Sequence, residues 1–268
     1  MRDGTPITTL RSGDQDPLWE ERRRRQEIRF RFLAPICVMW TPDVPPHAAQ
    51  AAVMGVRDAL KASGQIRELS IFGASQFAQG DYSSAQWYVT EAYKRQQLRR
   101  NAGYGPQLDI GQFTPLFTDE PWQADPHWEV LIVNQDLNSM IDGKFINFVF
   151  GATNLGFPYS VQSVSRLLSS VRDPGLQTEL IRRVLRHEVG HMFGLPIRDN
   201  NTIELLGKHC ANVCTMREGL SVEEWASQLA QENSLGLQFC GDCLTDFERA
   251  RSYPRPLSEL PEALRRSV

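Results

Sequence analysis

The run HEVGHMFGL at residues 187–195 constrains the fold of this chain more than any other feature. His187 and His191 are four residues apart, so on a helix their imidazoles lie about one turn from each other on the same face. Their ring nitrogens can then converge on one metal ion. Glu188 follows the first histidine directly and can reach a metal-bound water without binding the metal itself. The run therefore predicts a helix at the floor of a metal site.

A His-Glu-x-x-His pattern on a helix is typical of zinc peptidases, in which the glutamate acts as the general base. The expected helix has a good start, because Asp173 can cap it and Pro174 suits its first position. Its apolar residues project onto one broad arc, and its arginines, Arg182, Arg183 and Arg186, project onto the other side. Both histidines lie at the edge of the apolar arc, as ligands at the floor of a cleft would. Two core histidines bonded to the backbone remain the alternative.

Strands and helices alternate before this helix. We expect a first strand that runs from 28–33 into 36–40, further strands at 68–72 and 129–133, and helices at 46–63 and 84–99. Residues 145–151 and 159–164 are interpreted as two further strands that pair as a hairpin. Residues 100–127 contain several Gly and Pro without a clear period, so they are interpreted as a long surface connection. The order predicts an α/β sheet with a late antiparallel strand.

Composition and charge favour one ordinary globular domain. We expect a flexible segment at 1–27, then a single domain at 28–268 that divides into an α/β part (28–194) and a C-terminal part (195–268). The net charge of -3 gives no electrostatic reason to expect a nucleic acid or an anionic membrane as partner. The first residues are polar and lack the apolar core of a secretory signal. The sequence thus predicts a cytoplasmic, monomeric protein.

The residues after the helix must supply a third ligand, because catalytic zinc takes three protein ligands and keeps one position for water. Gly194 can end the helix in a left-handed conformation and turn the chain back toward the metal. In the metzincin pattern a histidine comes three residues later, where this chain has Ile197. The next histidine is His209. Asp199 and Glu204 are the alternatives, since carboxylates also bind zinc in peptidases.

Four of the five cysteines lie in the last third of the chain, at Cys210, Cys214, Cys240 and Cys243. In a reducing compartment such a cluster is more often a metal site than a pair of disulfides, although both are possible. Cys37 stands apart in an apolar strand, and we expect it to be a buried filler of the core.

Together, these late motifs resemble the archaemetzincin family of zinc metallopeptidases. The family has His-Glu-x-x-His-x-x-Gly, then a His-Cys pair, a second Cys, a Met two residues later and a downstream Cys-x-x-Cys. The matching positions here are His187, Glu188, His191, Gly194, His209, Cys210, Cys214, Met216, Cys240 and Cys243. The resemblance covers roughly residues 128–246. It implies an α/β metzincin-like catalytic domain with a twisted mixed sheet, an antiparallel edge strand, an active-site helix and a small zinc-stapled C-terminal part.

The resemblance also implies two zinc ions per chain. The three histidines would hold a catalytic zinc, and the four cysteines would form a closed structural site that pins the chain after His209. Met216 would lie in a turn beneath the catalytic zinc. The segment Phe150, Gly151 and Ala152 looks like the family's substrate-side edge strand.

Residues 196–208 depart from the family pattern, because they add about a dozen residues between the glycine turn and His209. A surface loop of this length adds little closure free energy, since that cost grows only logarithmically. We therefore favour His209 over Asp199 and Glu204, because Cys210 and Met216 keep the family spacing.

The expected reaction is zinc-dependent hydrolysis of a peptide bond. Zinc would lower the pKa of its bound water, and Glu188 would take the proton as the water attacks the carbonyl and pass it to the leaving amine. The substrate would lie along residues 148–154 as an added strand. The resemblance implies peptidase or aminopeptidase activity. One alternative is a two-zinc scaffold or peptide-binding protein with little turnover, and another is hydrolysis of a non-peptide amide.

Overall fold

The computed structural model describes residues 34–74, 84–98, 107–119, 127–141, 144–153 and 158–251. The segment expected at 1–27, the first part (28–33) of the first expected strand and the end of the substrate-side segment at Asn154 lie outside the described residues. Within the described part, no helix is both long enough and apolar enough to cross a membrane.

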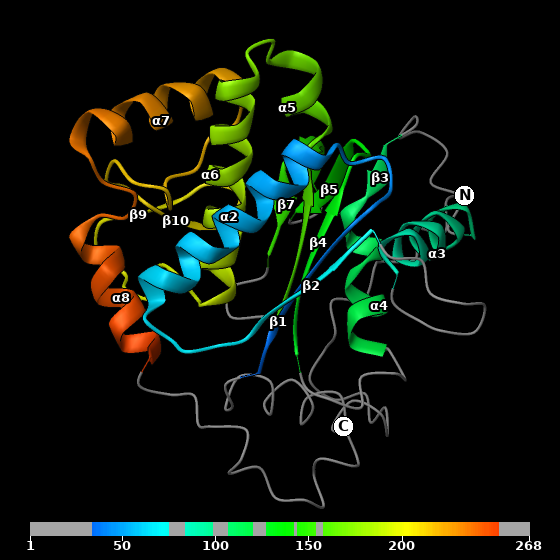
Figure 1. Ribbon diagram of the computed structural model, residues 1–268, viewed down its shortest axis with the longest axis horizontal. Helices are drawn as coiled ribbons and strands as arrows, with labels where there is room; N and C mark the ends of the chain where they lie inside the picture. The colour runs from blue at the N-terminus through cyan, green and yellow to red at the C-terminus, as the bar shows by residue number, and fades with distance from the viewer. Residues whose placement is uncertain are drawn as a thin grey trace, which may run out of the picture.

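A five-stranded mixed sheet forms the centre of the fold (Figure 1). Its order is β2 (Leu69–Gly73), β1 (Ile36–Trp40), β4 (Trp128–Val133), β8 (Tyr159–Ser163) and β7 (Gly151–Ala152). The first four strands are parallel, and β7 pairs with β8 in the antiparallel sense at the edge. Every residue of the central strand β4 is buried. This arrangement confirms the predicted α/β sheet with a late antiparallel strand.

Helices cover both faces of the sheet, so a hydrophobic core forms on each side. The long helices α2 (Pro46–Ser63) and α6 (Pro174–Met192) pack on one face, and α3 (Ala85–Leu98) and α4 (Thr114–Asp119) pack on the other (Figure 1). Side chains of β4 alternate between the two cores, as successive residues of a strand must. The helices at 46–63 and 84–99 were thus predicted to within one residue.

The close approach of α2 to α6 depends on one glycine. A Cβ atom on Gly55 would lie 2.3 Å from the backbone oxygen of Arg182 and 2.8 Å from the Cβ atom of Leu185. Any larger residue at position 55 would push the two helices apart. Glycine here therefore sets how near α2 lies to the helix that carries the His-Glu-x-x-His motif.

Two sequence predictions about the middle of the chain were wrong. Residues 107–119 are not a plain surface connection, because they form β3 (Leu108–Asp109), a 3-10 turn and α4, and their apolar side chains fill the second core. The predicted hairpin of 145–151 with 159–164 holds only at the end of its first segment, where Gly151 pairs with Gln162. Strand β6 (Lys144–Val149) pairs with β5 (Leu137–Ile141) in a separate sheet of order β3-β5-β6. Only β7 reaches β8.

The cause of the second error is β5, which was not predicted. Asn138 and Ser139 interrupt its apolar pattern, so no strand was expected there. Yet Asn138 is only 1% exposed and Ser139 8% exposed, because both lie between β3 and β6. Strand β6 therefore pairs with the neighbouring strand β5 and not with the segment at 159–164.

The C-terminal part lies beside α6 (Figure 1). It holds a hairpin of β9 (Thr202–Glu204) and β10 (Lys208–Cys210), followed by α7 (Val222–Leu235) and α8 (Gly241–Arg251). The short helix α5 (Ser165–Ser170) precedes α6. Most of this hairpin comes from residues 196–208, the segment in which the sequence departs from the family spacing, and its second strand continues through His209 to Cys210.

Candidate metal centres and cleft

The motif helix α6 begins and ends as the sequence indicates. The Asp173 side chain accepts a hydrogen bond of 2.9 Å from the backbone N of Gly175, and Pro174 is the first helical residue. After Met192, Gly194 adopts φ +85°, a left-handed conformation that favours glycine. The chain then turns back over the helix toward the hairpin.

The structure brings together the three histidines that were predicted as ligands. The Nε2 atoms of His187 and His191 are 3.0 Å apart, and one ring nitrogen from each of His187, His191 and His209 lies within 4.8 Å of the others. All three side chains are buried. The two carboxylates considered as rivals do not join this group. Asp199 is fully exposed and pairs with Lys208, while Glu204 lines the neighbouring cleft.

Backbone carbonyls fix the orientation of each ring. The Nδ1 atom of each histidine lies within hydrogen-bond distance of a backbone oxygen, which belongs to Thr215 for His187 (2.8 Å), Leu195 for His191 (2.7 Å) and Gly207 for His209 (3.0 Å). A carbonyl can only accept, so Nδ1 carries the proton and each Nε2 is left to face the common centre. Burial, followed by the charge of His209, lowers the pKa of His191 to about 3. Neutral imidazole is the form that binds a metal, so the donor set fits zinc.

Glu188 lies between α6 and the edge strand. The hydroxyl of Thr153 donates a hydrogen bond of 2.8 Å to Glu188 Oε2. A Cβ atom on Gly151 would lie 3.0 Å from Glu188 Oε1, so β7 passes directly over the carboxyl group. Burial raises the pKa of Glu188 to about 8. The residues predicted as the substrate-side strand, Phe150, Gly151 and Ala152, line the same cleft.

Met216 packs beneath the motif helix. Its side chain is fully buried, and a Cβ atom on Gly190 would lie 2.4 Å from its Sδ atom. Its backbone oxygen accepts a hydrogen bond of 2.9 Å from the N atom of Cys210. The turn that holds Met216 thus contacts both α6 and the residue that follows His209.

Glu218 is part of this centre, and sequence reasoning missed it. Its Oε2 atom lies 2.6 Å from Nε2 of His209, the nitrogen that faces the other two imidazoles. Burial lowers the pKa of His209, but the hydrogen bond and charge of Glu218 outweigh it and the pKa is raised. The only signal in the sequence was that Glu218 lies two residues after Met216, in the same turn. A carboxylate therefore borders the predicted metal position.

Buried ion pairs connect the arginine-bearing side of α6 to α7. Glu232 on α7 accepts a hydrogen bond of 2.8 Å from Arg183 and pairs with Arg186 at 3.3 Å. The hydroxyl of Thr215 also lies between Arg186 (2.9 Å) and Glu232 (3.2 Å). Because the Thr215 carbonyl orients His187, this network extends from α7 to the first predicted ligand.

The four cysteines form a second cluster. The Sγ atoms are 3.7 Å apart both between Cys210 and Cys240 and between Cys214 and Cys243, and all four lie within 4.8 Å of one another. A disulfide requires about 2.05 Å, so these pairs are not disulfides. A tetrahedron with zinc–sulfur bonds of about 2.3 Å has edges of about 3.8 Å, which the observed spacing matches. The donor set therefore fits a structural zinc.

A cleft of about 930 Å³ opens over the histidines and Glu188. One wall is formed by β6 and β7, and the other by residues 204–209 of the hairpin together with Glu218, Leu220 and Trp225. Apolar side chains line much of the β6–β7 wall, and charged side chains, among them Glu204, Lys208 and Glu218, stand among the apolar residues of the other. An extended chain can thus lie between the sheet edge and the hairpin.

Comparison with known proteins connects this fold to one family. No protein-family model matches the chain. The crystal structure of archaemetzincin from Methanopyrus kandleri is 21% identical, covers 82% of this chain and 96% of that chain, and has a TM-score of 0.54, so the two share a fold. A zinc-dependent peptidase from Methanocorpusculum labreanum is 17% identical, over 80% of this chain and 100% of that one, at a TM-score of 0.45. The fold is thus shared with the Methanopyrus archaemetzincin structure.

The chain also resembles an archaemetzincin in sequence. Over 103 residues the chain is 34% identical to archaemetzincin from Archaeoglobus fulgidus, which corresponds to 38% of this chain and 51% of the relative. The match thus spans about half the length of that relative. The predicted resemblance to the archaemetzincins is confirmed.

Proposed function

We propose that this protein is a zinc-dependent peptidase. The observation that carries the proposal is the convergence of three buried imidazoles, each oriented by a backbone carbonyl, beside a carboxylate that lies against an edge strand. Zinc bound there would act as a Lewis acid and lower the pKa of water at the site. The similarity to archaemetzincins supports the same function.

The residues around the centre would transfer the proton, bind the peptide and exclude water. Glu188 would accept a proton at its carboxyl oxygen and return it to the leaving amine, while Thr153 holds the other side of its carboxyl group. The edge strand β7 would bind the peptide as an added strand. The neighbouring apolar residues would exclude water and contact its side chains.

The decisive experiment is digestion of a peptide library by the zinc-loaded full chain. We expect cleavage that a chelator abolishes, and a loss of about 10²- to 10⁴-fold in Glu188→Gln protein, the usual contribution of a general base. Zinc content should stay at the wild-type level in this variant, since Glu188 is not a proposed ligand. Glu179→Gln, on the exposed side of α6, is the matched control. Equal cleavage by wild-type and Glu188→Gln protein would overturn the proposal.

One observation favours a second candidate, a two-zinc peptide-binding scaffold with little turnover. Glu218 occupies the metal-facing nitrogen of His209, so the third ligand has a competing partner. Zinc content cannot separate the two functions. Peptides that bind in the cleft but are not cut with zinc present would identify the scaffold.

Other features of the proposed function rest on the sequence alone. They are aminopeptidase-like cleavage, a monomeric state, a cytoplasmic location and the division into a lead-in and one domain, whereas the proposed two zinc ions per chain are also supported by the two donor sets. Each remains a prediction of the sequence.

A further inference from the structure

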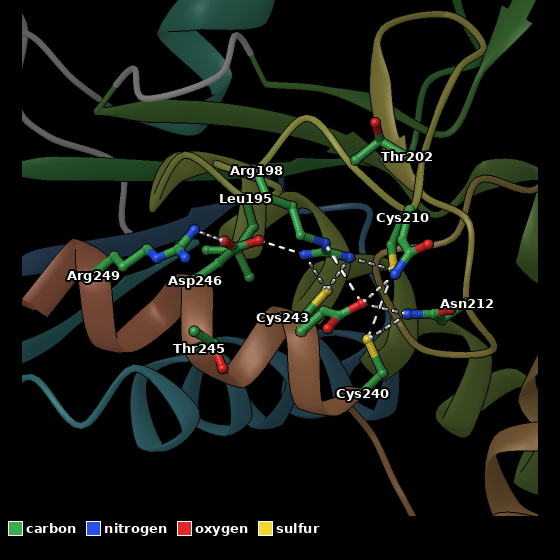
Figure 2. A network of polar contacts seen from close by, with 12 residues as sticks. Leu195, Arg198, Thr202, Cys210, Asn212, Cys240, Cys243, Thr245, Asp246 and Arg249 are labelled. Carbon is green, nitrogen blue, oxygen red and sulfur yellow. Dashed lines mark hydrogen bonds and ion pairs between the residues drawn. The ribbon is translucent and has the colours of Figure 1, made fainter.

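A buried arginine from the 196–208 segment contacts the four-cysteine cluster (Figure 2). Nη2 of Arg198 lies 2.9 Å from Sγ of Cys210, and its Nη1 and Nη2 atoms lie 3.7 and 3.8 Å from Sγ of Cys243. The guanidinium also pairs with Asp246, which is fully buried, and lies 3.7 Å from Asp242. The Arg198 side chain is only 6% exposed. It is therefore part of the interior of the C-terminal part.

The charges explain why a cation lies there. A zinc ion bound by four thiolates leaves a net charge of about -2 at the cluster, since each cysteine ligand is deprotonated. Buried negative charge is costly unless a cation or several donors compensate for it. The planar guanidinium can donate to two sulfur atoms and to a carboxylate at the same time, which a lysine ammonium cannot match. Asp246 completes the arrangement by orienting the guanidinium.

The hydrogen bond from Arg198 to Cys210 also holds the start of the inserted segment close to the residues that follow its end. Arg198 lies near its start and Cys210 lies two residues past its end, and the Arg198 side chain donates to the Cys210 sulfur. Both ends of the β9–β10 hairpin are therefore held at the cluster. Because His209 precedes Cys210, the position of the third predicted histidine depends on this closure. The inserted segment is thus attached to the cluster at two points.

We infer that Arg198 is a positioning residue that compensates the charge of the four-thiolate metal site and, through it, fixes the hairpin that carries His209. The inference concerns the cysteine site and the hairpin, and it holds whether or not the cleft cuts peptides. It predicts that the inserted segment is stabilised by the metal cluster itself, through hydrogen bonds from Arg198 to the sulfur ligands.

The test measures the affinity of the cysteine site by titrating Co²⁺ into the metal-free full chain and competing it with Zn²⁺. Thiolate-to-cobalt charge-transfer absorption reports this site and not the histidine site. We expect Arg198→Met to weaken the affinity about 10- to 100-fold, the usual effect of removing a hydrogen-bond partner of a metal ligand. The metal affinity of Arg198→Lys protein should lie between the affinities of wild type and Arg198→Met. Arg249→Met is the matched control, because Arg249 pairs with the same Asp246 but is 56% exposed and has no recorded contact with a sulfur.

Hydrogen exchange supplies the second measurement. Backbone amides of residues 202–208 should exchange faster in zinc-loaded Arg198→Met protein than in wild type, and at the wild-type rate in Arg249→Met. Wild-type affinity together with wild-type exchange in Arg198→Met would overturn the inference. If that variant does not fold, the lysine variant decides, and an unchanged affinity in Arg198→Lys would overturn the role of the guanidinium.

Discussion

The Sδ atom of Met216 lies 2.4 Å from the position that a Cβ atom on Gly190 would occupy. No side chain fits between them, so α6 and the turn beneath it are in backbone-to-side-chain contact. Gly190 lies between Glu188 and His191 in the motif, at one of its two variable positions. The glycine there is thus explained by the packing of Met216.

Gly190→Ala should therefore destabilise the protein by overpacking. We expect the free energy of unfolding to fall by about 1–3 kcal/mol, measured by urea denaturation of the zinc-loaded protein. Gly241→Ala is the control, since a Cβ atom there meets nothing within 4 Å. Adding Met216→Ala should recover part of the loss in Gly190→Ala, because the two residues are in contact. An unchanged unfolding free energy in Gly190→Ala would show that the turn can move away freely.

Glu232 compensates two buried arginines, so Glu232→Gln should be strongly destabilising. The variant leaves the charges of Arg183 and Arg186 with less compensation in the core. Breaking a buried ion pair from one side usually costs about 3–5 kcal/mol. Glu179→Gln removes an exposed carboxylate 3.8 Å from Arg182 and should cost about 0–1 kcal/mol. Equal unfolding free energies for the two variants would contradict a structural role for the network.

The lowered pKa of Asp136 predicts how its contribution to stability depends on pH. Burial raises its pKa, but hydrogen bonds from Arg166 and Gln107 outweigh this, so the pKa in the folded protein lies below the usual 3.8. The stabilisation is therefore complete above the unfolded-state pKa and is lost as pH falls through the lower, folded-state value. The difference in unfolding free energy between wild type and Asp136→Asn should be constant near neutral pH and shrink below about pH 4. A difference that does not change between pH 3 and pH 7 would refute this assignment.

Replacing one cysteine of the cluster should distinguish the cysteine metal site from the histidine metal site. Cys240→Ser should lower the zinc content by one ion per chain and lower the thermal midpoint, because a structural zinc contributes folding free energy. Cys37→Ala is the control. Burial, followed by the charges of Glu129 and Glu68, raises the pKa of Cys37 to about 12, so that thiol stays protonated and should bind no metal. Loss of zinc from Cys37→Ala, or full zinc content in Cys240→Ser, would contradict the assignment of the cysteines.

Local patterns explain which features could be predicted from the sequence. The cap at Asp173, the four-residue spacing of His187 and His191 and the turn at Gly194 each depend on neighbouring residues, so a short window of sequence contains them. The cysteine pairs were recognisable for the same reason. The position of His209 required the family resemblance, because a hairpin of residues 196–208 intervenes.

Long-range contacts explain what could not be predicted. A helical projection assigns Arg183 and Arg186 to a polar side, yet both are buried, because Glu232 reaches them from another helix. Glu218 contacts His209 only after the Met216 turn has folded. Residues 107–119 carry turn-forming residues among their apolar ones, and only packing against the sheet shows that they belong to the core.

The length of the edge strand has a consequence for the behaviour of the molecule in solution. An exposed sheet edge can pair with any extended chain, including a neighbouring copy, and long flat edges lead to aggregation. Strand β7 offers only Gly151 and Ala152 in its ladder with β8. Such a short edge can form few backbone hydrogen bonds with an added strand. A chain that binds at β7 must therefore gain most of its affinity from side chains, and a neighbouring copy gains little from pairing at this edge.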